Sequence, residues 1–238
     1  MNNSIFKRQS GRYYDQLREI KITHNFTKNA DSSVLIEMGN TKVLCNATIL
    51  NKVPNFINEK QQGWITAEYS MIPSSTLQRN IREVILGEQS GRSKEIQRLI
   101  GRAIRSSVNL KKIHGKTIHI DCDVLNADGG TRCASITGGF IATYEAIKKL
   151  DYDTDDTIKN IIAAVSVGKL NNNVLLLDMD YSEDSSCEVD LNIVMNNKGD
   201  IIEIQGSSEK NQFSRNCLNK MLDLAFQGIN QIINHNFK

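Results

Sequence analysis

The stretch Asp128-Gly129-Gly130-Thr131-Arg132 decides the fold, because it lies where one hydrophobic period gives way to another. Residues 117–125 alternate apolar and polar side chains as a β-strand does, and residues 131–150 carry apolar side chains at the spacing of a helix. The adjacent glycines allow the backbone between these segments to approach a ligand closely. The stretch therefore predicts a strand that leads directly into the N-terminus of a helix.

A helix N-terminus in this position is suited to an anion. Its first N–H groups have no partner within the helix, and the helix dipole gives that end a partial positive charge. Arg132 adds donors whose geometry matches phosphate oxygens. The chain contains neither G-x-x-x-x-G-K-[ST] nor a G-x-G-x-x-G after a first strand, so the standard nucleotide-binding loops are excluded. We therefore expect an anion site built at residues 128–132.

The composition is that of an ordinary globular protein. The chain has 238 residues, of which 39% are hydrophobic and 24% charged, and we expect one domain over residues 1–238. Its five cysteines lack C-x-x-C spacing and are interpreted as buried thiols in a reducing compartment. Residues 1–11 contain no apolar signal segment, and no hydrophobic run reaches membrane length, so the protein is predicted to be cytoplasmic without a membrane partner.

Strand and helix patterns alternate in two similar halves. In the first half, strands are predicted at residues 34–38, 41–50, 63–69 and 117–125, with helices from Lys94 and over 131–150. After a polar spacer at 151–157, strands are predicted at residues 161–167, 174–179, 187–195 and 201–204, followed by a helix capped by Ser214. This order predicts an α+β fold of layered mixed β-sheets and helices. It leaves an internal duplication open, although no sequence repeat is visible.

Basic residues concentrate in one region. Six arginines occur at positions 79, 82, 92, 98, 102 and 105. Residues 71–90 lose periodicity and are interpreted as a long functional loop, whereas the helix that follows combines an apolar stripe with a basic face. A solvated helix face is the simpler interpretation of these charges. Arginine in place of lysine favours phosphate contacts, because arginine binds phosphate through two parallel hydrogen bonds.

Two carboxylates are candidates for chemistry. In the strand 187–195, Asp190 lies on the side opposite the apolar residues and is expected to face away from the core, and Asp184 precedes this strand. The pair could hold Mg²⁺, or one carboxyl could donate a proton to a departing alkoxide. The alternative is the polar outer face of a sheet. The four histidines lack zinc-ligand spacing, and Trp64 is interpreted as a core residue rather than a platform for a base.

Several segments together resemble the ribonuclease PH family of phosphate-dependent 3′-to-5′ exoribonucleases. They are 25–28 (NFTK), 39–45 (GNTKVLC), 63–69 (GWITAEY), 91–100 (GRSKEIQRLI), 121–132 (DCDVLNADGGTR), 163–168 (AAVSVG) and 202–206 (IEIQG). The resemblance implies a ribonuclease PH-type domain that processes tRNA precursors and ribosomal RNA. It would remove 3′-terminal nucleotides reversibly as nucleoside diphosphates, and it would assemble as a homohexamer, a trimer of dimers.

The resemblance also implies roles for individual residues. Inorganic phosphate, the co-substrate, would bind to Arg92, Gly130, Thr131 and Arg132. Asp190 is the candidate general acid, and Asp184 would position it or help to hold Mg²⁺, for which both carboxylates are candidate ligands.

The long loop of the family guides RNA with arginines, and Arg79 and Arg82 match two of them. A third is replaced, because Ser74 follows Pro73 where the family usually has arginine. Two other hypotheses remain at this stage. One is an RNA-binding ring subunit without activity. The other is a metal-dependent nuclease that uses water, which would leave Arg92 and the glycine-rich stretch without a role.

Overall fold

The computed structural model describes residues 8–150, 154–171, 173–208 and 212–237. Its first sheet has five strands in the order β1-β2-β3-β5-β4. They are β1 (Ile20–His24), β2 (Ser32–Met38), β3 (Thr41–Leu50), β4 (Trp64–Met71) and β5 (Thr117–Asn126). The first three strands form antiparallel hairpins, whereas β4 pairs in parallel with β5 at the sheet edge. A parallel pair needs a crossover connection, and helix α2 (Gly91–Ser107) supplies it.

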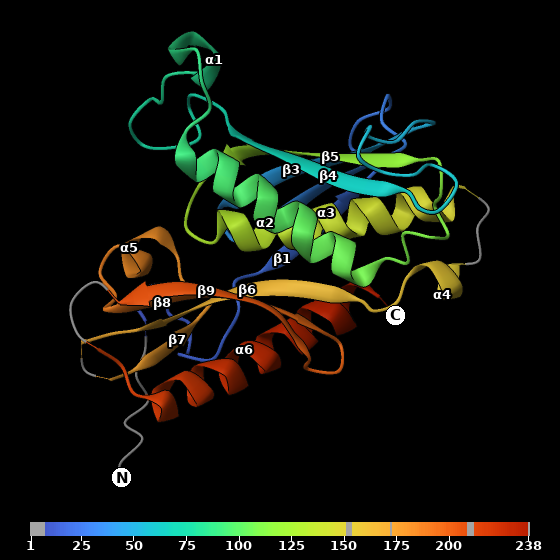
Figure 1. Ribbon diagram of the computed structural model, residues 1–238. Helices are drawn as coiled ribbons and strands as arrows, with labels where there is room; N and C mark the ends of the chain where they lie inside the picture. The colour runs from blue at the N-terminus through green and yellow to red at the C-terminus, as the bar shows by residue number, and fades with distance from the viewer. Residues whose placement is uncertain (1–7, 151–153, 172, 209–211, 238) are drawn as a thin grey trace.

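The second sheet has four antiparallel strands in the order β7-β6-β8-β9. They are β6 (Ile162–Lys169), β7 (Leu175–Leu177), β8 (Val189–Asn196) and β9 (Ile201–Ser208). Figure 1 shows four layers: the first sheet, the helices α2 and α3 (Thr131–Lys148), the second sheet, and the C-terminal helix α6 (Arg215–Asn236). Because β6 and β8 lie between two helical layers, nearly every residue in them is buried.

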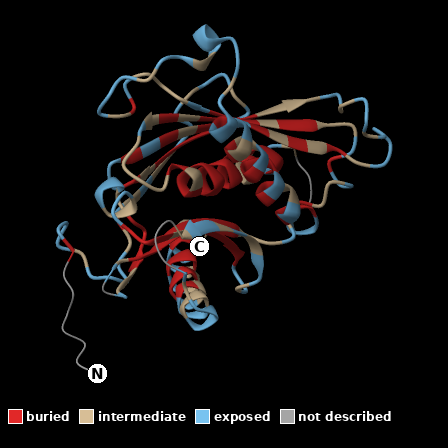
Figure 2. Cartoon of the chain, turned by 60° about the vertical axis from the view of Figure 1, so that its left-hand side comes forward, coloured by how far each residue is buried: buried red, intermediate tan, exposed pale blue. Residues whose placement is uncertain are grey.

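Helix α3 lies at the centre of the molecule. It contacts β2 and β3 of the first sheet and β6 of the second, and it is buried on almost all sides (Figure 2). Gly138 makes the close approach to the first sheet possible, since a Cβ there would lie 2.7 Å from Ile36 Cγ2 and 2.8 Å from Cys45 Sγ. The position of the N-terminus of α3 is therefore fixed by packing against both sheets.

Three short helices lie in the connections. Helix α1 (Glu83–Leu86) lies at the tip of the protruding loop 72–90, α4 (Thr154–Thr157) precedes β6, and α5 (Tyr181–Asp184) lies between β7 and β8 (Figure 1). In α1 the side chains of Val84, Ile85 and Leu86 are all exposed. The expected long loop is therefore present and packs little against its own subunit.

The α+β fold predicted from the sequence is confirmed. Helix α2 begins at Gly91 rather than at Lys94, because the Ser90 side chain accepts a hydrogen bond from the backbone N–H of Ser93 and caps the helix there. The predicted Ser214 cap of α6 is present. The sequence did not predict β1 or the short helices, and part of the predicted spacer, residues 151–153, lies outside the described residues. The two sheets differ in strand order, so an internal duplication stays a prediction.

The cysteines have no disulfide partners within the described chain. Cys45, Cys122, Cys133 and Cys187 are buried thiols, as predicted, whereas Cys217 is only half-buried. Among the described residues, none of the helices has the length and the apolar content that crossing a membrane requires.

We expect Gly138→Ala to destabilise the protein by about 1 to 3 kcal/mol, because the added methyl group overpacks the contact between α3 and the first sheet. This loss should exceed the gain of about 1 kcal/mol in helix propensity. Gly91→Ala is the matched control, since nothing lies within 4 Å of a Cβ at that helical position. Urea unfolding measures both variants, and equal stability of the two would contradict this account of the packing.

Candidate active site

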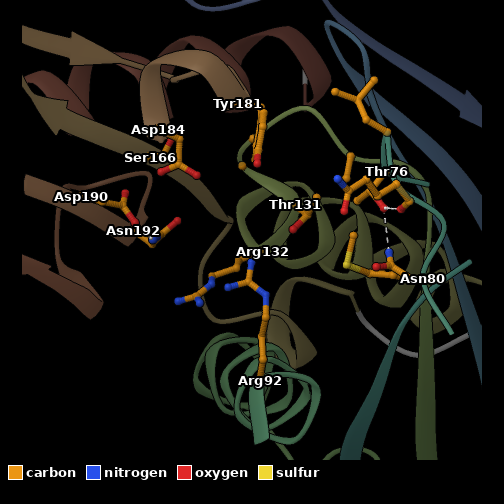
Figure 3. Close-up of a pocket in the computed structure, with 16 residues that line it drawn as sticks. Thr76, Asn80, Arg92, Thr131, Arg132, Ser166, Tyr181, Asp184, Asp190 and Asn192 are labelled. Carbon is orange, nitrogen blue, oxygen red and sulfur yellow. Dashed lines mark hydrogen bonds between the residues drawn. The ribbon is translucent and has the colours of Figure 1, made fainter. Parts of the chain in front are cut away.

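A pocket of about 590 Å³ opens where the two sheets meet the N-terminus of α3. Its walls come from the loop that follows β4, the first turn of α2, the stretch after β5, helix α5 and strand β8. Figure 3 shows positively charged side chains from α2 and α3 below the pocket and two acidic side chains to one side. Segments far apart in the sequence therefore converge on one small volume.

The glycine-rich stretch adopts the backbone conformation for which its glycines are needed. Gly129 and Gly130 have φ values of 74° and 66°, in the left-handed region that other residues rarely adopt. A Cβ on Gly129 would lie 2.7 Å from the carbonyl oxygen of Met179. Gly130 is the N-cap of α3, so the first backbone N–H groups of the helix begin at Thr131. This is the strand-to-helix junction that the sequence predicted.

A buried ion pair supports this junction from behind. Arg18 Nη2 donates to Asp178 Oδ1 at 2.7 Å, and Arg18 Nε donates to Asp178 Oδ2 at 3.1 Å. The same guanidinium donates through Nη1 to the carbonyl oxygen of Asp128 at 2.5 Å. Thr41 Oγ1 donates to the carbonyl oxygen of Gly129 at 2.6 Å. Both carbonyl oxygens are therefore satisfied by Arg18 and Thr41, while Gly130, Thr131 and Arg132, where the N–H groups of the helix begin, line the pocket.

Two arginines provide the positive charge of the pocket, and they are held differently. Arg132 donates through Nη1 to Gln205 Oε1 at 2.5 Å, and its Nη2 lies 3.6 Å from Glu95 Oε2. Arg92 lies on the first turn of α2, and among the described residues its guanidinium makes no hydrogen bond and no ion pair. Thr131 adds a hydroxyl that lies 3.0 Å from the buried Tyr69 Oη. Arg92 is thus free to bind an anion.

Asp190 lines the same pocket as the two arginines, and its pKa is raised. Burial, reinforced by the neighbouring charge of Asp184, raises the pKa of Asp190 to about 6, although Arg132 and Arg92 oppose the shift. Asn192 Nδ2 donates to Asp190 Oδ2 at 3.2 Å, whereas Asp190 Oδ1 is buried without a partner in the described structure. A buried carboxylate oxygen without a hydrogen-bond partner is stabilised by binding either a proton or a cation.

Helix α5 positions Asp184, and the N-terminal arm holds α5. Asp180 and Glu183 form a capping box at the start of this helix. The Glu183 carboxylate accepts hydrogen bonds from the guanidinium of Arg8, and Arg12 Nη2 lies 3.4 Å from Glu183 Oε2. The sequence analysis missed these residues. The D-x-x-E spacing of the capping box was a usable signal, but no sequence pattern connects Arg8 to Glu183.

The structure brings most of the predicted site residues together. The pocket-lining ones are Arg92, Gly130, Thr131, Arg132, Asp184 and Asp190. Arg79 and Arg82 are exposed on the protruding loop and do not line the pocket. Trp64 also lies outside the pocket, half-buried, with the Arg105 guanidinium 4.4 Å from its ring centroid.

The expectation that Asp190 faces away from the core is wrong. Helix α3 covers that side of β8, so Asn192 and Val194 are buried there and Asp190 is largely shielded from solvent. The interpretation of this side as the polar outer face of a sheet is wrong for the same reason. Asp190 instead lines the pocket beside the N-terminus of α3.

The carboxylates fit a magnesium ion. Among the residues that the structure describes, no three His, Cys, Asp or Glu side chains cluster as a dedicated metal site. Mg²⁺ is often bound by one or two carboxylates together with substrate phosphates and water. Asp184 and Asp190 line the same pocket, and the unpartnered Asp190 Oδ1 is a suitable oxygen ligand.

The chain folds into a layered α+β domain in which a helix N-terminus faces two carboxylates, and comparison with known sequences identifies its family. Residues 16–148 match the 3′ exoribonuclease family, domain 1, and residues 160–228 match domain 2 of the same family. The chain belongs to the 3′ exoribonuclease family, which is the ribonuclease PH family that its motifs resemble.

Solved structures share the fold over nearly the whole chain. Rice (Oryza sativa) Rrp46 is 18% identical with a TM-score of 0.79, and the match covers 95% of this chain and 97% of that one. The Archaeoglobus fulgidus exosome with RNA bound to the active site gives 20% identity and a TM-score of 0.80, covering 98% and 93%. An archaeal exosome core gives 19% identity and a TM-score of 0.76, covering 98% and 92%.

We expect Asp178→Ala to destabilise the protein by about 3 to 5 kcal/mol, because it leaves the buried Arg18 guanidinium without its counter-charge. Glu203→Ala is the control, since it breaks the Arg102–Glu203 pair at the surface, where such a pair contributes about 1 kcal/mol or less. Urea unfolding of both variants gives the two values. A loss for Asp178→Ala no larger than for the control would mean that the buried pair does not stabilise the junction.

We expect Asp190→Asn to make the protein more stable at neutral pH. A carboxyl whose pKa rises from 3.8 to about 6 on folding holds its proton in the folded state after the unfolded chain has released it. Stability is therefore lost as pH rises from about 4 to 6, by about 3 kcal/mol for this group. Thermal unfolding at pH 4 and pH 7.5 should show the variant and the wild type alike at the lower pH, with the variant more stable at the higher. A constant difference would contradict the raised pKa.

Proposed function

We propose that this protein is a phosphorolytic 3′-to-5′ exoribonuclease that uses inorganic phosphate to remove 3′-terminal nucleotides from RNA as nucleoside diphosphates. The observation that carries the proposal is the arrangement of the pocket, in which two arginines and a helix N-terminus face two carboxylates. Phosphoryl transfer is catalysed mainly by positioning and by charge stabilisation, and this pocket offers both. Hydrolysis by a metal-bound water would leave Arg92 and the N-terminus of α3 without a role.

In the proposed reaction the phosphate binds between Arg92, Arg132 and the N–H groups that begin at Thr131. One phosphate oxygen attacks the phosphorus of the last phosphodiester, and the bond between that phosphorus and the 3′ oxygen of the preceding nucleotide breaks. The products are a nucleoside diphosphate and an RNA shorter by one nucleotide. The reverse reaction adds nucleotides from diphosphates with release of phosphate.

Asp190 is the proposed general acid. The departing 3′ oxygen needs a proton, and a carboxyl with a pKa of about 6 remains protonated in a useful fraction of molecules near neutral pH. Burial and, to a smaller extent, the negative charge of Asp184 keep this pKa raised, and Asp184 helps to place the acid. Mg²⁺ would be held by Asp184 and, in molecules where Asp190 has lost its proton, by Asp190 as well, and it would supply positive charge that offsets the charge of the phosphate groups.

The RNA and the assembly follow from the resemblance. We infer that the substrate is chiefly the 3′ end of tRNA precursors, with the exposed Arg79 and Arg82 guiding the strand towards the pocket. We also infer a homohexameric ring in the cytoplasm, in which the poorly packed loop 72–90 contacts a neighbouring subunit. Two of the structural neighbours are archaeal exosome structures, one of them with RNA bound to the active site, which supports RNA as the substrate and assembly with other subunits.

The test is to incubate the protein with Mg²⁺ and a tRNA carrying a short 3′ extension, with and without inorganic phosphate, and to separate the released nucleotides by chromatography. Diphosphates that appear only with phosphate are expected. Monophosphates released without phosphate would establish hydrolysis. RNA binding without release of any nucleotide would favour an RNA-binding ring subunit that lacks activity.

We expect Arg92→Ala to raise the KM for inorganic phosphate about 10-fold to 100-fold, because it removes charge-assisted hydrogen bonds to the anion. Arg92 has no protein partner in the described structure, so the substitution should leave the fold intact. Arg98→Ala is the control, since this arginine is exposed on the same helix outside the pocket. An unchanged KM for phosphate in Arg92→Ala, measured by diphosphate release, would remove Arg92 from the site.

A further inference from the structure

The pocket has a second, apolar side that the phosphate chemistry does not use. Met71, Leu77, Ala127 and Tyr181 line it, and Tyr181 is the one aromatic residue among the described residues that form the walls. Tyr181 is 59% exposed to solvent. An exposed aromatic ring beside an anion site is a suitable surface for the base of a nucleotide.

The backbone of Tyr181 is fixed by the same stretch that forms the anion site. Tyr181 is the first residue of α5, and its backbone N–H donates to Asp128 Oδ1 at 3.2 Å. A Cβ on Gly129 would lie 2.9 Å from the Tyr181 backbone nitrogen, so the two segments touch. The backbone of Tyr181 therefore has a fixed position relative to the N-terminus of α3, and only two side-chain torsions remain to be ordered on binding.

The direction of the ring fits this role. Figure 3 shows Tyr181 extending into the pocket above Thr131, between Asp184 on one side and Thr76 on the other. A phosphate at the N-terminus of α3 would lie below the ring, and the sugar and base of the nucleotide that it attacks would extend towards it. Met71 and Leu77 lie on the loop side of the same pocket and provide further apolar surface.

Two of the three polar residues on the loop side, Thr76 and Asn80, are engaged with their side chains within the loop, whereas Gln78 is engaged there through its backbone carbonyl. Thr76 Oγ1 donates to the carbonyl oxygen of Gln78 at 2.6 Å, and Asn80 Nδ2 donates to Thr76 Oγ1 at 2.8 Å. These donors are therefore not directed at the edge of a base. Contact through the face of the base, which all four bases possess, suits an enzyme that must remove any terminal nucleotide.

We propose that Tyr181 stacks on the base of the 3′-terminal nucleotide, the one that leaves as the nucleoside diphosphate, with Met71 and the exposed Leu77 contributing apolar surface to the same pocket. This inference rests on the proposed function, because it assigns the terminal nucleotide to the apolar side of the same pocket. The stacked base holds the last phosphodiester above the bound phosphate. The contact is independent of sequence and contributes to binding of the terminal nucleotide.

The test pairs a change in the protein with a change in the RNA. Phosphorolysis of an RNA ending in adenosine is compared with that of the same RNA ending in an abasic ribose, and the shortened RNA is measured on a gel for the wild type and for Tyr181→Ala. We expect Tyr181→Ala to lower kcat/KM about 10-fold to 100-fold on the normal RNA, the range for loss of base–aromatic stacking. On the abasic RNA, the wild type and the variant should differ less than about twofold, since the base is absent from both complexes.

Two variants serve as controls. Tyr181→Phe keeps the ring and should remain within about twofold of the wild type on both RNAs. Tyr13→Ala removes a tyrosine that is 50% exposed and lies outside the pocket, and it should leave kcat/KM unchanged on both RNAs. An equal loss for Tyr181→Ala on the normal and the abasic RNA would overturn the proposal, because Tyr181 would then act only on the position of α5. No loss on either RNA would overturn it as well.

A binding measurement separates this inference from the proposed function. An RNA with 2-aminopurine at its 3′ terminus is titrated with protein in the absence of phosphate, where no phosphorolysis occurs. Stacking should quench the fluorescence with the wild type and Tyr181→Phe but not with Tyr181→Ala. Quenching that depends on Tyr181, together with no release of diphosphate from any RNA, would refute the activity and retain the base site. Equal quenching by the wild type and Tyr181→Ala, or no RNA binding, would refute the base site.

Discussion

The buried pair of Arg18 and Asp178 is the interaction on which the rest of the site depends. Asp178 has a φ of 52°, a left-handed conformation that is uncommon outside glycine, and Arg18 is 8% exposed. Two buried charges are tolerated when each is paired and hydrogen-bonded, and here the remaining donors of the guanidinium bind the carbonyls of Asp128 and Gly129. The pair therefore joins the N-terminal arm, the second sheet and the start of α3 at one point, and it sets the direction in which that helix presents its N–H groups.

The pocket contains two charged groups that the described part of the chain does not satisfy. Arg92 lacks a counter-ion among the described residues, and Asp190 Oδ1 lacks a hydrogen-bond partner. If these two side chains paired with one another, the site would be neutral and closed to phosphate. Their separation across the pocket keeps an anion subsite and an acid subsite distinct. Because Arg92 does not pair with Asp190, burial can keep the pKa of Asp190 raised.

Local signals in the sequence were sufficient for the strand-to-helix junction, because the change of period and the paired glycines lie within a few residues of one another. The same holds for the Ser214 cap and for the apolar stripe of α2. The setting of Asp190 was not predictable, since the residue pattern of β8 does not reveal that α3 covers its second side. Contacts such as Arg8 with Glu183 join residues 175 positions apart, and no periodicity encodes them. The spacing of residues in the sequence thus identified the chemical groups. Their burial and their long-range contacts could be determined only from the tertiary structure.

The walls of the pocket come from both halves of the chain, and this has a consequence for synthesis. A polypeptide emerging from the ribosome can complete the first sheet and α3 before Asp178, Asp184 and Asp190 have been made. The glycine-rich turn then has neither its buried counter-charge nor an acid opposite it. The proposed activity therefore requires the second sheet, because Asp184 and Asp190 belong to that half of the chain. The division of the site between two halves therefore means that a partly synthesised chain contains the glycine-rich turn without its acidic partners.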